Sequence, residues 1–164
     1  MKILIMLVTL VASSYSFAET VFIVKKNFSR KNILIFDAHV KDCKLVDPYI
    51  TVNWFNTDKN RSERLGNLER NHFTPIILEK TTKTISFTVG AGNMVNLRPE
   101  EKIGQLQLDP KCKPYVLMNV ENQKILLKEL YFGVGLTFKG FKLHTMVVDG
   151  LSDDGTEYSN EINF

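Results

Sequence analysis

Residues Ile33 to Val40 read Ile-Leu-Ile-Phe-Asp-Ala-His-Val, a stretch in which every second side chain forms a wholly apolar set. Successive side chains of a β-strand point to opposite faces, so this alternation predicts a strand with one buried face. The opposite face would carry Asp37 and His39 beside two isoleucines. The apolar set, which we expect to face the core, comprises Leu34, Phe36, Ala38 and Val40.

Strand-like segments also flank this stretch. Thr20 to Lys26 is rich in β-branched and aromatic residues, and the polar residues Asn27 to Asn32 follow it, which predicts a hairpin with the first strand described. Asp47 and Pro48 then open a third strand over Tyr49 to Phe55. The side chains of this strand that should point inward are Ile50, Val52 and Trp54.

Period-two segments continue to the C-terminus. Among them are Tyr115–Val120, Ile125–Phe132, a long strand over Thr137–Val148 with a bend at Gly140, and a terminal strand over Tyr158–Phe164. Short strands at this spacing predict an all-β fold, a mainly antiparallel β-sandwich or partly open barrel of about nine strands, with one short α-helix. The long strand and the terminal strand are the expected edges of the sheet.

The segment after Phe55 has a different pattern, which predicts the helix. Thr57 or Asp58 can cap it, because a side-chain oxygen there can accept an unpaired backbone N–H of the first turn. Arg61 to Asn71 then places apolar side chains at helical spacing, and Pro75 ends the helix. The expected apolar stripe consists of Leu65, Leu68 and His72.

The first residues have the pattern of a cleaved secretory signal. A positive charge at Lys2 precedes Ile3 to Ala12, an uncharged run of ten residues that is apolar apart from Thr9. Ser16 and Ala18 are small residues of the kind that signal peptidase needs. A helix of that length covers about 15 Å, half of a hydrocarbon core of about 30 Å, so a membrane anchor is not expected. The mature chain should begin at Glu19.

Cleavage would divide the chain into a leader of residues 1–18 and a single β-rich domain of residues 19–164. We expect this domain to be periplasmic or secreted, without a stable membrane anchor. The hydrophobic content of 44% is sufficient for a folded core. The formal net charge of +3 is too small for a dedicated nucleic-acid-binding protein, so no nucleic acid is expected among the partners.

The two cysteines, Cys43 and Cys112, are consistent with an oxidising compartment, where two cysteines in an exported domain commonly form one disulfide. Each lies in polar, turn-like sequence, which suits a link between two loops. Neither belongs to a CxxC pair, and the three histidines have no local ligand spacing, so neither a metal site nor a cofactor is expected. The histidines are His39, His72 and His144.

Several short motifs follow one another in a set order along the chain. They are Lys26-Asn27-x-Ser29-Arg30-Lys31-Asn32, Phe36-Asp37, Asp47-Pro48-x-x-x-Val52-x-Trp54, Leu65-x-x-Leu68-Glu69-Arg70, a hairpin from Lys124 to Tyr131 and a closing strand pair from Phe141 to Ile162. Together they resemble an uncharacterised family of exported bacterial domains of unknown function. This resemblance implies export and a small β domain, and it implies no known activity. Asn71-His72-Phe73 stands where the family has a small residue, an aromatic residue and glycine.

The most suggestive cluster combines Trp54 with Glu69 and Arg70. In a shallow pocket, Trp54 could stack on a ligand, Arg70 could bind an anion with two hydrogen bonds, and Glu69 could accept one. The alternative is structural: Trp54 belongs to the core, and the charged pair ties the helix to the sheet or to the Asn27–Asn32 turn. That turn is a second candidate for binding an anion, through Asn27, Arg30 and Asn32, or else an ordinary hairpin loop.

No sequence motif identifies a catalytic residue, so the preferred interpretation is a non-catalytic binding module. Its partner would be a small molecule, a cell-envelope component or another protein. One alternative is a hydrolytic enzyme in which Glu69 acts as acid or base, with a raised pKa and a second carboxylate such as Asp47 or Asp37 nearby. The other is a structural or assembly protein that pairs through an edge strand.

Overall fold

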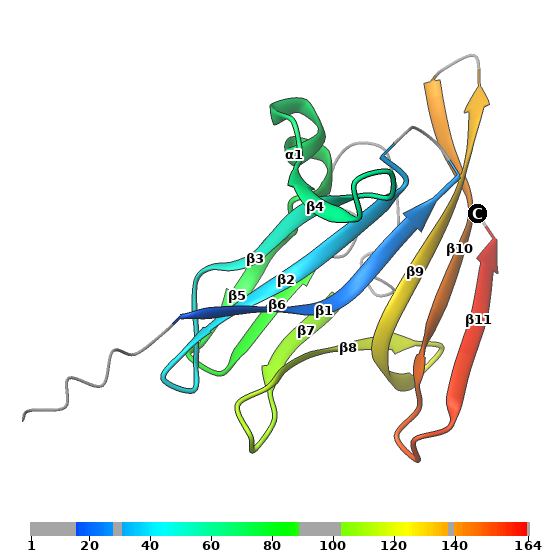
Figure 1. The fold of residues 1–164 in the computed structure, drawn as a ribbon. Coiled ribbons are helices and arrows are strands. Elements are labelled where there is room, and N and C mark those ends of the chain that lie inside the picture. Colours follow the sequence, from blue (N-terminus) through cyan, green and yellow to red (C-terminus); the bar gives the residue numbers. More distant parts are fainter. Residues whose placement is uncertain (1–15, 28–30, 89–102, 138–139, 164) are drawn as a thin grey trace, which may run out of the picture.

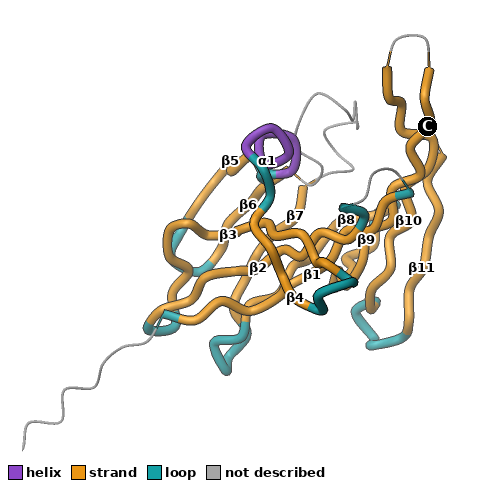
Figure 2. The backbone as a smooth tube through the Cα atoms, turned by 45° about the horizontal axis from the view of Figure 1, so that its top comes forward, coloured by secondary structure: helices purple, strands orange, loops and turns teal. Residues whose placement is uncertain are grey.

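The computed structural model describes residues 16–27, 31–88, 103–137 and 140–163. Most of the leader, Arg30 and the loops that the sequence indicates at Gly90–Asn93 and Arg98–Glu101 lie outside these ranges. Within them, eleven strands form one strongly curled sheet, a half-barrel, and one short helix lies at its end (Figures 1 and 2). The fold is therefore all-β with mainly antiparallel pairing, as predicted, in the partly open form.

Two runs of neighbouring strands, β1 to β4 and β5 to β8, make up the two halves of the curled sheet (Figure 1). Helix α1 connects the first half to the second, and β9 to β11 complete the sheet along one side. The elements are β1 (Phe17–Lys26), β2 (Ile33–Lys41), β3 (Lys44–Asn56), β4 (Arg61–Arg64), α1 (Asn67–Phe73), β5 (Ile76–Lys80), β6 (Thr84–Thr88), β7 (Ile103–Leu108), β8 (Pro114–Val120), β9 (Gln123–Thr137), β10 (Gly140–Leu151) and β11 (Glu157–Asn163).

The two halves pack against each other through buried aromatic rings. Phe22 on β1 stacks on Phe36 of the adjacent β2, with 4.3 Å between ring centroids, and lies 6.3 Å from Phe87 on β6. Phe87 has room because position 104 is glycine: a Cβ at Gly104 would lie 2.6 Å from the Phe87 ring. The core therefore depends on close, specific packing between strands from both halves.

Strand β9 joins the halves because it pairs with β1 of one half and with β8 of the other. Its first residues pair with β8, and Glu129 to Phe132 pair in parallel with β1, the one parallel pairing in the described sheet. Leu126 pairs with β8 and β10 at once, and Glu129 to Phe132 pair with β1 and β10 at once. Strands β8 and β1 therefore share one edge of β9, in succession, while β10 occupies the other.

A β-bulge allows β9 to bury apolar side chains on both sides of its bend. Leu127 pairs with Gly150 and Glu129 pairs with Asp149, so Lys128 has no partner in the ladder. One extra residue shifts the alternation by one position. The inward-facing residues accordingly change from odd to even numbers across the bulge; they are Ile125, Leu127, Leu130 and Phe132.

The predicted alternation in β2 and β3 is confirmed. All four β2 side chains assigned to the core are buried, as are Ile50 and Val52 on β3, and Trp54 packs against the same core while partly exposed. The predicted hairpin between β1 and β2 is also confirmed, since the backbone N–H of Lys26 donates to the carbonyl oxygen of Asn32 at 3.0 Å.

The helix predicted over Arg61 to Asn71 is wrong in its first half. Strand β4 takes its place, paired with the end of β3, and Leu68 is 78% exposed instead of contributing to a buried stripe. The turn before β4 gives the reason. Asn56 Oδ1 accepts the backbone N–H of Asp58 at 3.1 Å, and Asn60 adopts a positive φ of 48°, so these polar residues form a hairpin turn and cap no helix.

The single long strand predicted over Thr137 to Val148 is also wrong. Strand β9 ends at Thr137, and β10 begins at Gly140, which pairs back with Thr137. The two strands have similar composition, so the period-two pattern runs on from one to the other and does not reveal where β9 ends and β10 begins. Strand β10 has partners on both edges and is not an edge strand, whereas the terminal strand β11 is at an edge as predicted.

The predicted disulfide between Cys43 and Cys112 is present and joins the two halves at the end opposite α1 (Figure 1). Cys43 lies in the β2–β3 turn and Cys112 in the β7–β8 turn, both with positive φ. The two cysteines are 69 positions apart in the sequence. Closing a loop of that length in the unfolded chain stabilises the fold by about 4 kcal/mol in the chain-entropy account.

The start of β1 bears on the predicted leader. Phe17 and Ala18 pair with Val40 and His39 of β2, but both side chains are exposed. Cleavage after Ala18 would thus remove one end of a strand and leave the buried part of β1 in place. Within the described ranges, no helix is long and apolar enough to cross a membrane.

Leucines on β9 offer a matched test of this architecture. Leu130 is fully buried where β9 pairs with β1, and Leu136 is 79% exposed near the end of the same strand. We expect Leu130→Ala to lower the free energy of unfolding by about 2–5 kcal/mol, because it leaves a cavity where the halves meet. Leu136→Ala should change it by less than about 0.5 kcal/mol. Urea unfolding of both variants measures this, and equal effects would contradict the assigned role of β9.

Candidate functional site

The sequence-predicted residue Glu69 lies in α1, at the end of the half-barrel that carries this helix (Figure 2). The helix begins after Gly66, whose backbone N–H donates to Glu69 Oε2 at 3.2 Å. The same oxygen accepts a hydrogen bond from Lys31 Nζ at 2.6 Å. Lys31 lies in the β1–β2 turn, separated from β2 by Asn32, so Glu69 ties the helix to that hairpin.

Two lysines bring aromatic rings into the same cluster. Lys31 Nζ lies 5.5 Å from the ring centroid of Trp54, and Lys26 Nζ lies 4.3 Å from that of Phe73. A cation over an aromatic face is attracted by the ring's negative charge density. We call these five residues, Lys26, Lys31, Trp54, Glu69 and Phe73, the helix junction.

The charges within the helix junction shift one another's protonation. Burial acts to raise the pKa of Glu69, but hydrogen bonds from Lys31 and from the Gly66 N–H, with the charges of Lys31 and Lys26, hold that pKa below its usual value of 4.5. Burial lowers the pKa of Lys26 below 10.5, and nearby Lys31 lowers it further, while Glu69 opposes the shift. At neutral pH, Glu69 is therefore an ionised carboxylate that pairs with Lys31 and whose charge also attracts that of Lys26.

The other predicted binding residues are placed separately. Asn27 Oδ1 accepts a backbone N–H of β9 at 2.8 Å, and Asn32 contributes its carbonyl oxygen to the β1–β2 hairpin. Arg70 Nη2 donates to Asn67 Oδ1 within α1 at 2.6 Å. Arg30 lies outside the described residues. Of the predicted cluster, the structure brings together only Trp54 and Glu69 in the described part of the chain, and Lys31 connects them.

This geometry suits attachment of the helix better than acid–base catalysis. A carboxylic acid that donates a proton near neutral pH needs a raised pKa, commonly beside a second carboxylate. Glu69 has a lowered pKa and a lysine partner. The proposed companion Asp37 is engaged elsewhere, since it accepts hydrogen bonds from Thr20 Oγ1 at 2.7 Å and from Asn53 Nδ2 at 3.2 Å.

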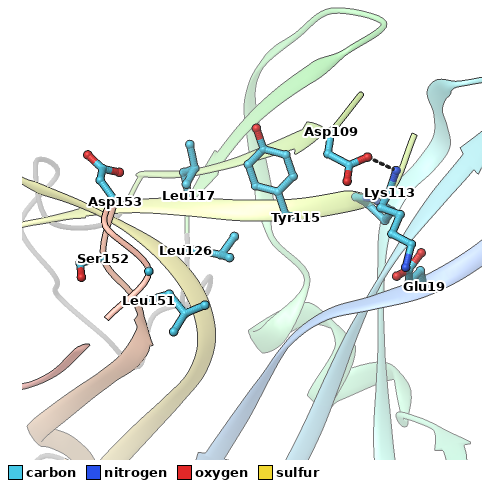
Figure 3. A pocket seen from close by; sticks show the side chains of 11 residues that line it. Glu19, Asp109, Lys113, Tyr115, Leu117, Leu126, Leu151, Ser152 and Asp153 are labelled. Atoms are coloured by element: carbon cyan, nitrogen blue, oxygen red, sulfur yellow. Dashed lines mark hydrogen bonds between the residues drawn. The ribbon is translucent and has the colours of Figure 1, made fainter. Parts of the chain in front are cut away.

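A hollow lies on the face of the sheet that points away from the core, at the strands β8, β9 and β10 (Figure 3). Tyr115 and Leu117 alternate along β8 with the buried Val116, so they point outward. Leu117 pairs with Leu126 on β9, and Leu126 pairs with Leu151 on β10, which places three leucines side by side across three strands. The hollow has a volume of about 560 Å³, and we call it the outer groove.

Charged side chains line the two sides of the outer groove. Glu19, Asp109 and Lys113 lie on one side, and Ser152 and Asp153 lie on the other (Figure 3). Asp109 is held in place, because its Oδ1 accepts the backbone N–H of Lys113 at 2.8 Å. The arrangement is an apolar floor between three carboxylates and one ammonium group, and it offers contacts to a ligand without a catalytic pair.

The β10–β11 turn that borders the outer groove is internally bonded. Asp154 Oδ1 accepts hydrogen bonds from Ser152 Oγ and Thr156 Oγ1, each at 2.7 Å, and from the Thr156 backbone N–H at 3.0 Å. The hydrogen bonds from Ser152 and then Thr156 lower the pKa of Asp154 to about 2. Asp154 therefore organises the turn, and its neighbour Asp153 is exposed.

Sequence reasoning did not find the outer groove. Its floor depends on the pairing register that aligns Leu117, Leu126 and Leu151 on three different strands. A pattern within one strand does not predict how that strand is aligned with its neighbours. One signal was present in the sequence: the polar residues Ser152 and Asp153 come directly after an apolar strand, and the turn pair Asp154-Gly155 follows them.

The described residues show no candidate metal centre, since no three His, Cys, Asp or Glu side chains among them gather closely enough. His39 forms a hydrogen-bonding contact with Thr51 Oγ1 at 2.9 Å, and His144 is exposed on β10. The side chain of His72 lies outside what the structure describes.

Comparison with known proteins adds no assignment, because no protein-family model, curated protein or solved structure matches the chain. The resemblance to an exported bacterial family therefore stays a prediction. The functional interpretation depends on the geometry of the helix junction and the outer groove.

The helix junction predicts a pH-dependent stability effect. The folded-state pKa of Glu69 lies below its unfolded value, so its ionised form stabilises the fold at neutral pH, and this contribution is lost as the pH falls below 4.5 through the folded-state pKa. We expect Glu69→Gln to lower the free energy of unfolding by about 0.5–1 kcal/mol at pH 7, because the ion pair is partly exposed. The difference from wild type should shrink toward pH 3.

The matched control is Glu79→Gln, which removes the same charge from an exposed position on β5. It should leave stability nearly unchanged across the same pH range. Urea unfolding at pH 7, 5, 4 and 3 provides the comparison. A Glu69→Gln effect that is constant with pH would exclude the ion pair as its source.

Proposed function

We propose that this protein is an exported, non-catalytic binding module, and that its ligand binds in the outer groove. One observation carries the proposal: Tyr115, Leu117, Leu126 and Leu151 gather in a hollow on the face of the sheet that does not cover the core. Apolar side chains on the solvent side of a sheet contribute nothing to the core, and a concave apolar floor is the usual property of a ligand site.

The surroundings of the floor support binding over catalysis. The nearby carboxylates Glu19, Asp109 and Asp153 come from three separate elements and frame the hollow from its two sides (Figure 3). Among the described lining residues, the Ser152 hydroxyl is bonded to the carboxylate of Asp154, but the pKa of Asp154 is lowered to about 2, so this carboxylate is a weak base for activating a nucleophile. A ligand with an apolar part would remove the leucine row from water, gaining roughly 25 cal/mol for each Å² buried.

Export is the second part of the proposal. The leader pattern before Glu19 supports it, and the Cys43–Cys112 disulfide is of the kind that persists in oxidising compartments. We expect the full chain, expressed in a bacterium with its leader, to yield periplasmic or secreted protein. Intact-mass analysis should give a chain that begins at Glu19 with the disulfide formed. Recovery of the uncleaved chain in the cytoplasm would contradict export.

Binding in the outer groove is tested with the neutral apolar fluorophore N-phenyl-1-naphthylamine. We expect saturable fluorescence enhancement with the wild-type protein, because the probe exchanges water for the leucine row. Leu126→Gln should weaken its affinity by about tenfold, since a polar group replaces apolar contact area on the floor.

Leu136→Gln is the matched control, because it makes the same change at a 79% exposed position on the same strand, outside the outer groove. It should leave probe affinity unchanged. Thermal unfolding of each variant shows that the fold is intact. Absence of saturable binding, or equal affinities of the two variants, would refute the outer groove as the site.

A further inference from the structure

A second hollow adjoins the outer groove on the other side of the β10–β11 turn. It has a volume of about 690 Å³ and lies between that turn and the turn that joins β8 to β9. It shares Ser152 and Asp153 with the outer groove, so the two hollows are neighbours across one hairpin. We call it the turn hollow; its other lining includes Gln123, Lys124, Asp154, Glu157 and Tyr158.

The two hollows together are acidic, although the protein is basic. Their lining side chains comprise five carboxylates and two ammonium groups, Lys113 and Lys124, and cleavage before Glu19 would add the N-terminal ammonium group. The whole chain, by contrast, has a formal net charge of +3. A cavity with low-dielectric walls and one sign of charge concentrates its field on whatever enters it. The carboxylates are Glu19, Asp109, Asp153, Asp154 and Glu157.

Among the described residues, none of the carboxylates that line the two hollows takes part in an ion pair. In the described part of the chain, the ion pairs join Lys25 to Glu129, Lys31 to Glu69, and Lys59 and Arg61 to Glu63, all away from both hollows. Carboxylates without an internal cation can be neutralised by one that a ligand supplies.

The acidic residues in and beside the β10–β11 turn indicate which class of cation a ligand would carry. Asp154 is committed to hydrogen bonds inside the turn, while Asp153 and Glu157 on either side of it are exposed. A divalent cation needs several oxygen ligands converging on one point. No such convergence exists among the described residues, so an organic cation that spreads along the lining suits the site better than a metal ion.

We propose that the outer groove and the turn hollow form one site for a basic, amphipathic peptide segment, in which an apolar side chain lies on the leucine row and a neighbouring arginine or lysine is held by Asp153 and Glu157. This inference rests on the proposed function and specifies its partner. Guanidinium and ammonium groups bind carboxylates by charge-assisted hydrogen bonds, and electrostatic complementarity selects them over neutral groups.

The experiment compares two peptides of nearly the same shape. They are acetyl-Phe-Ala-Arg-Arg-amide and its neutral counterpart with citrulline in place of both arginines. Calorimetric titration at low ionic strength should show the arginine peptide binding at least tenfold more tightly. The preference should fall to within about twofold in 0.5 M NaCl, because salt screens exposed charges.

Variants locate the charge that causes the preference. The double variant Asp153→Asn and Glu157→Gln should lose most of the arginine preference while binding the citrulline peptide as before. The matched control, Asp58→Asn and Glu79→Gln, removes two exposed acidic charges from outside both hollows and should keep the preference. All of these positions are exposed, and thermal unfolding checks that each variant is folded.

The outcomes separate this inference from the proposed function. Equal binding of both peptides, weakened by Leu126→Gln, would leave the outer groove as a ligand site and overturn the basic-peptide proposal. A preference that survives Asp153→Asn and Glu157→Gln, or that the control variant also loses, would overturn it as well. Absence of binding by both peptides and by N-phenyl-1-naphthylamine would refute the proposed function itself.

Discussion

The structure depends on one strand that pairs with three others. Strand β9 pairs with β8 and then with β1 along one edge, and with β10 along the other, so it connects both halves of the sheet. Buried strands of this kind need apolar side chains along their whole inner face. The bulge at Lys128 meets that need while the strand bends, because Leu127 and Leu130 can both point inward.

The same bend produces the outer groove. Opposite the bulge, Gly150 approaches β9 so closely that a Cβ there would collide with the carbonyl oxygen of Leu126. The end of β10 thereby lies against β9, and its Leu151 takes its place next to Leu126 and Leu117. The bend that keeps apolar side chains of β9 in the core therefore also brings the three leucines of the outer groove together on the opposite face, beside the β10–β11 turn.

The limits of sequence reasoning follow from which interactions are local. The buried face of β2 could be predicted from Ile33 to Val40, because the alternation of apolar side chains within one strand shows which face is turned to the core. The β4 segment could not, since its four residues form a strand only through pairing with the end of β3. Glu69 could be identified as a charged partner near Trp54, but its lysine partner decides its role, and that depends on where the β1–β2 turn meets α1. The outer groove required the cross-strand register itself.

Native-state hydrogen exchange tests most directly whether β9 makes the two halves one cooperative unit. Backbone amides of β9 between Leu126 and Phe132 should exchange only through global unfolding, with the same opening free energy as the inner amides of β2 and β7. That free energy should equal the one obtained from urea unfolding. Exchange of the β1–β4 amides through a separate, lower-energy opening, while β5–β8 stay protected, would contradict the account.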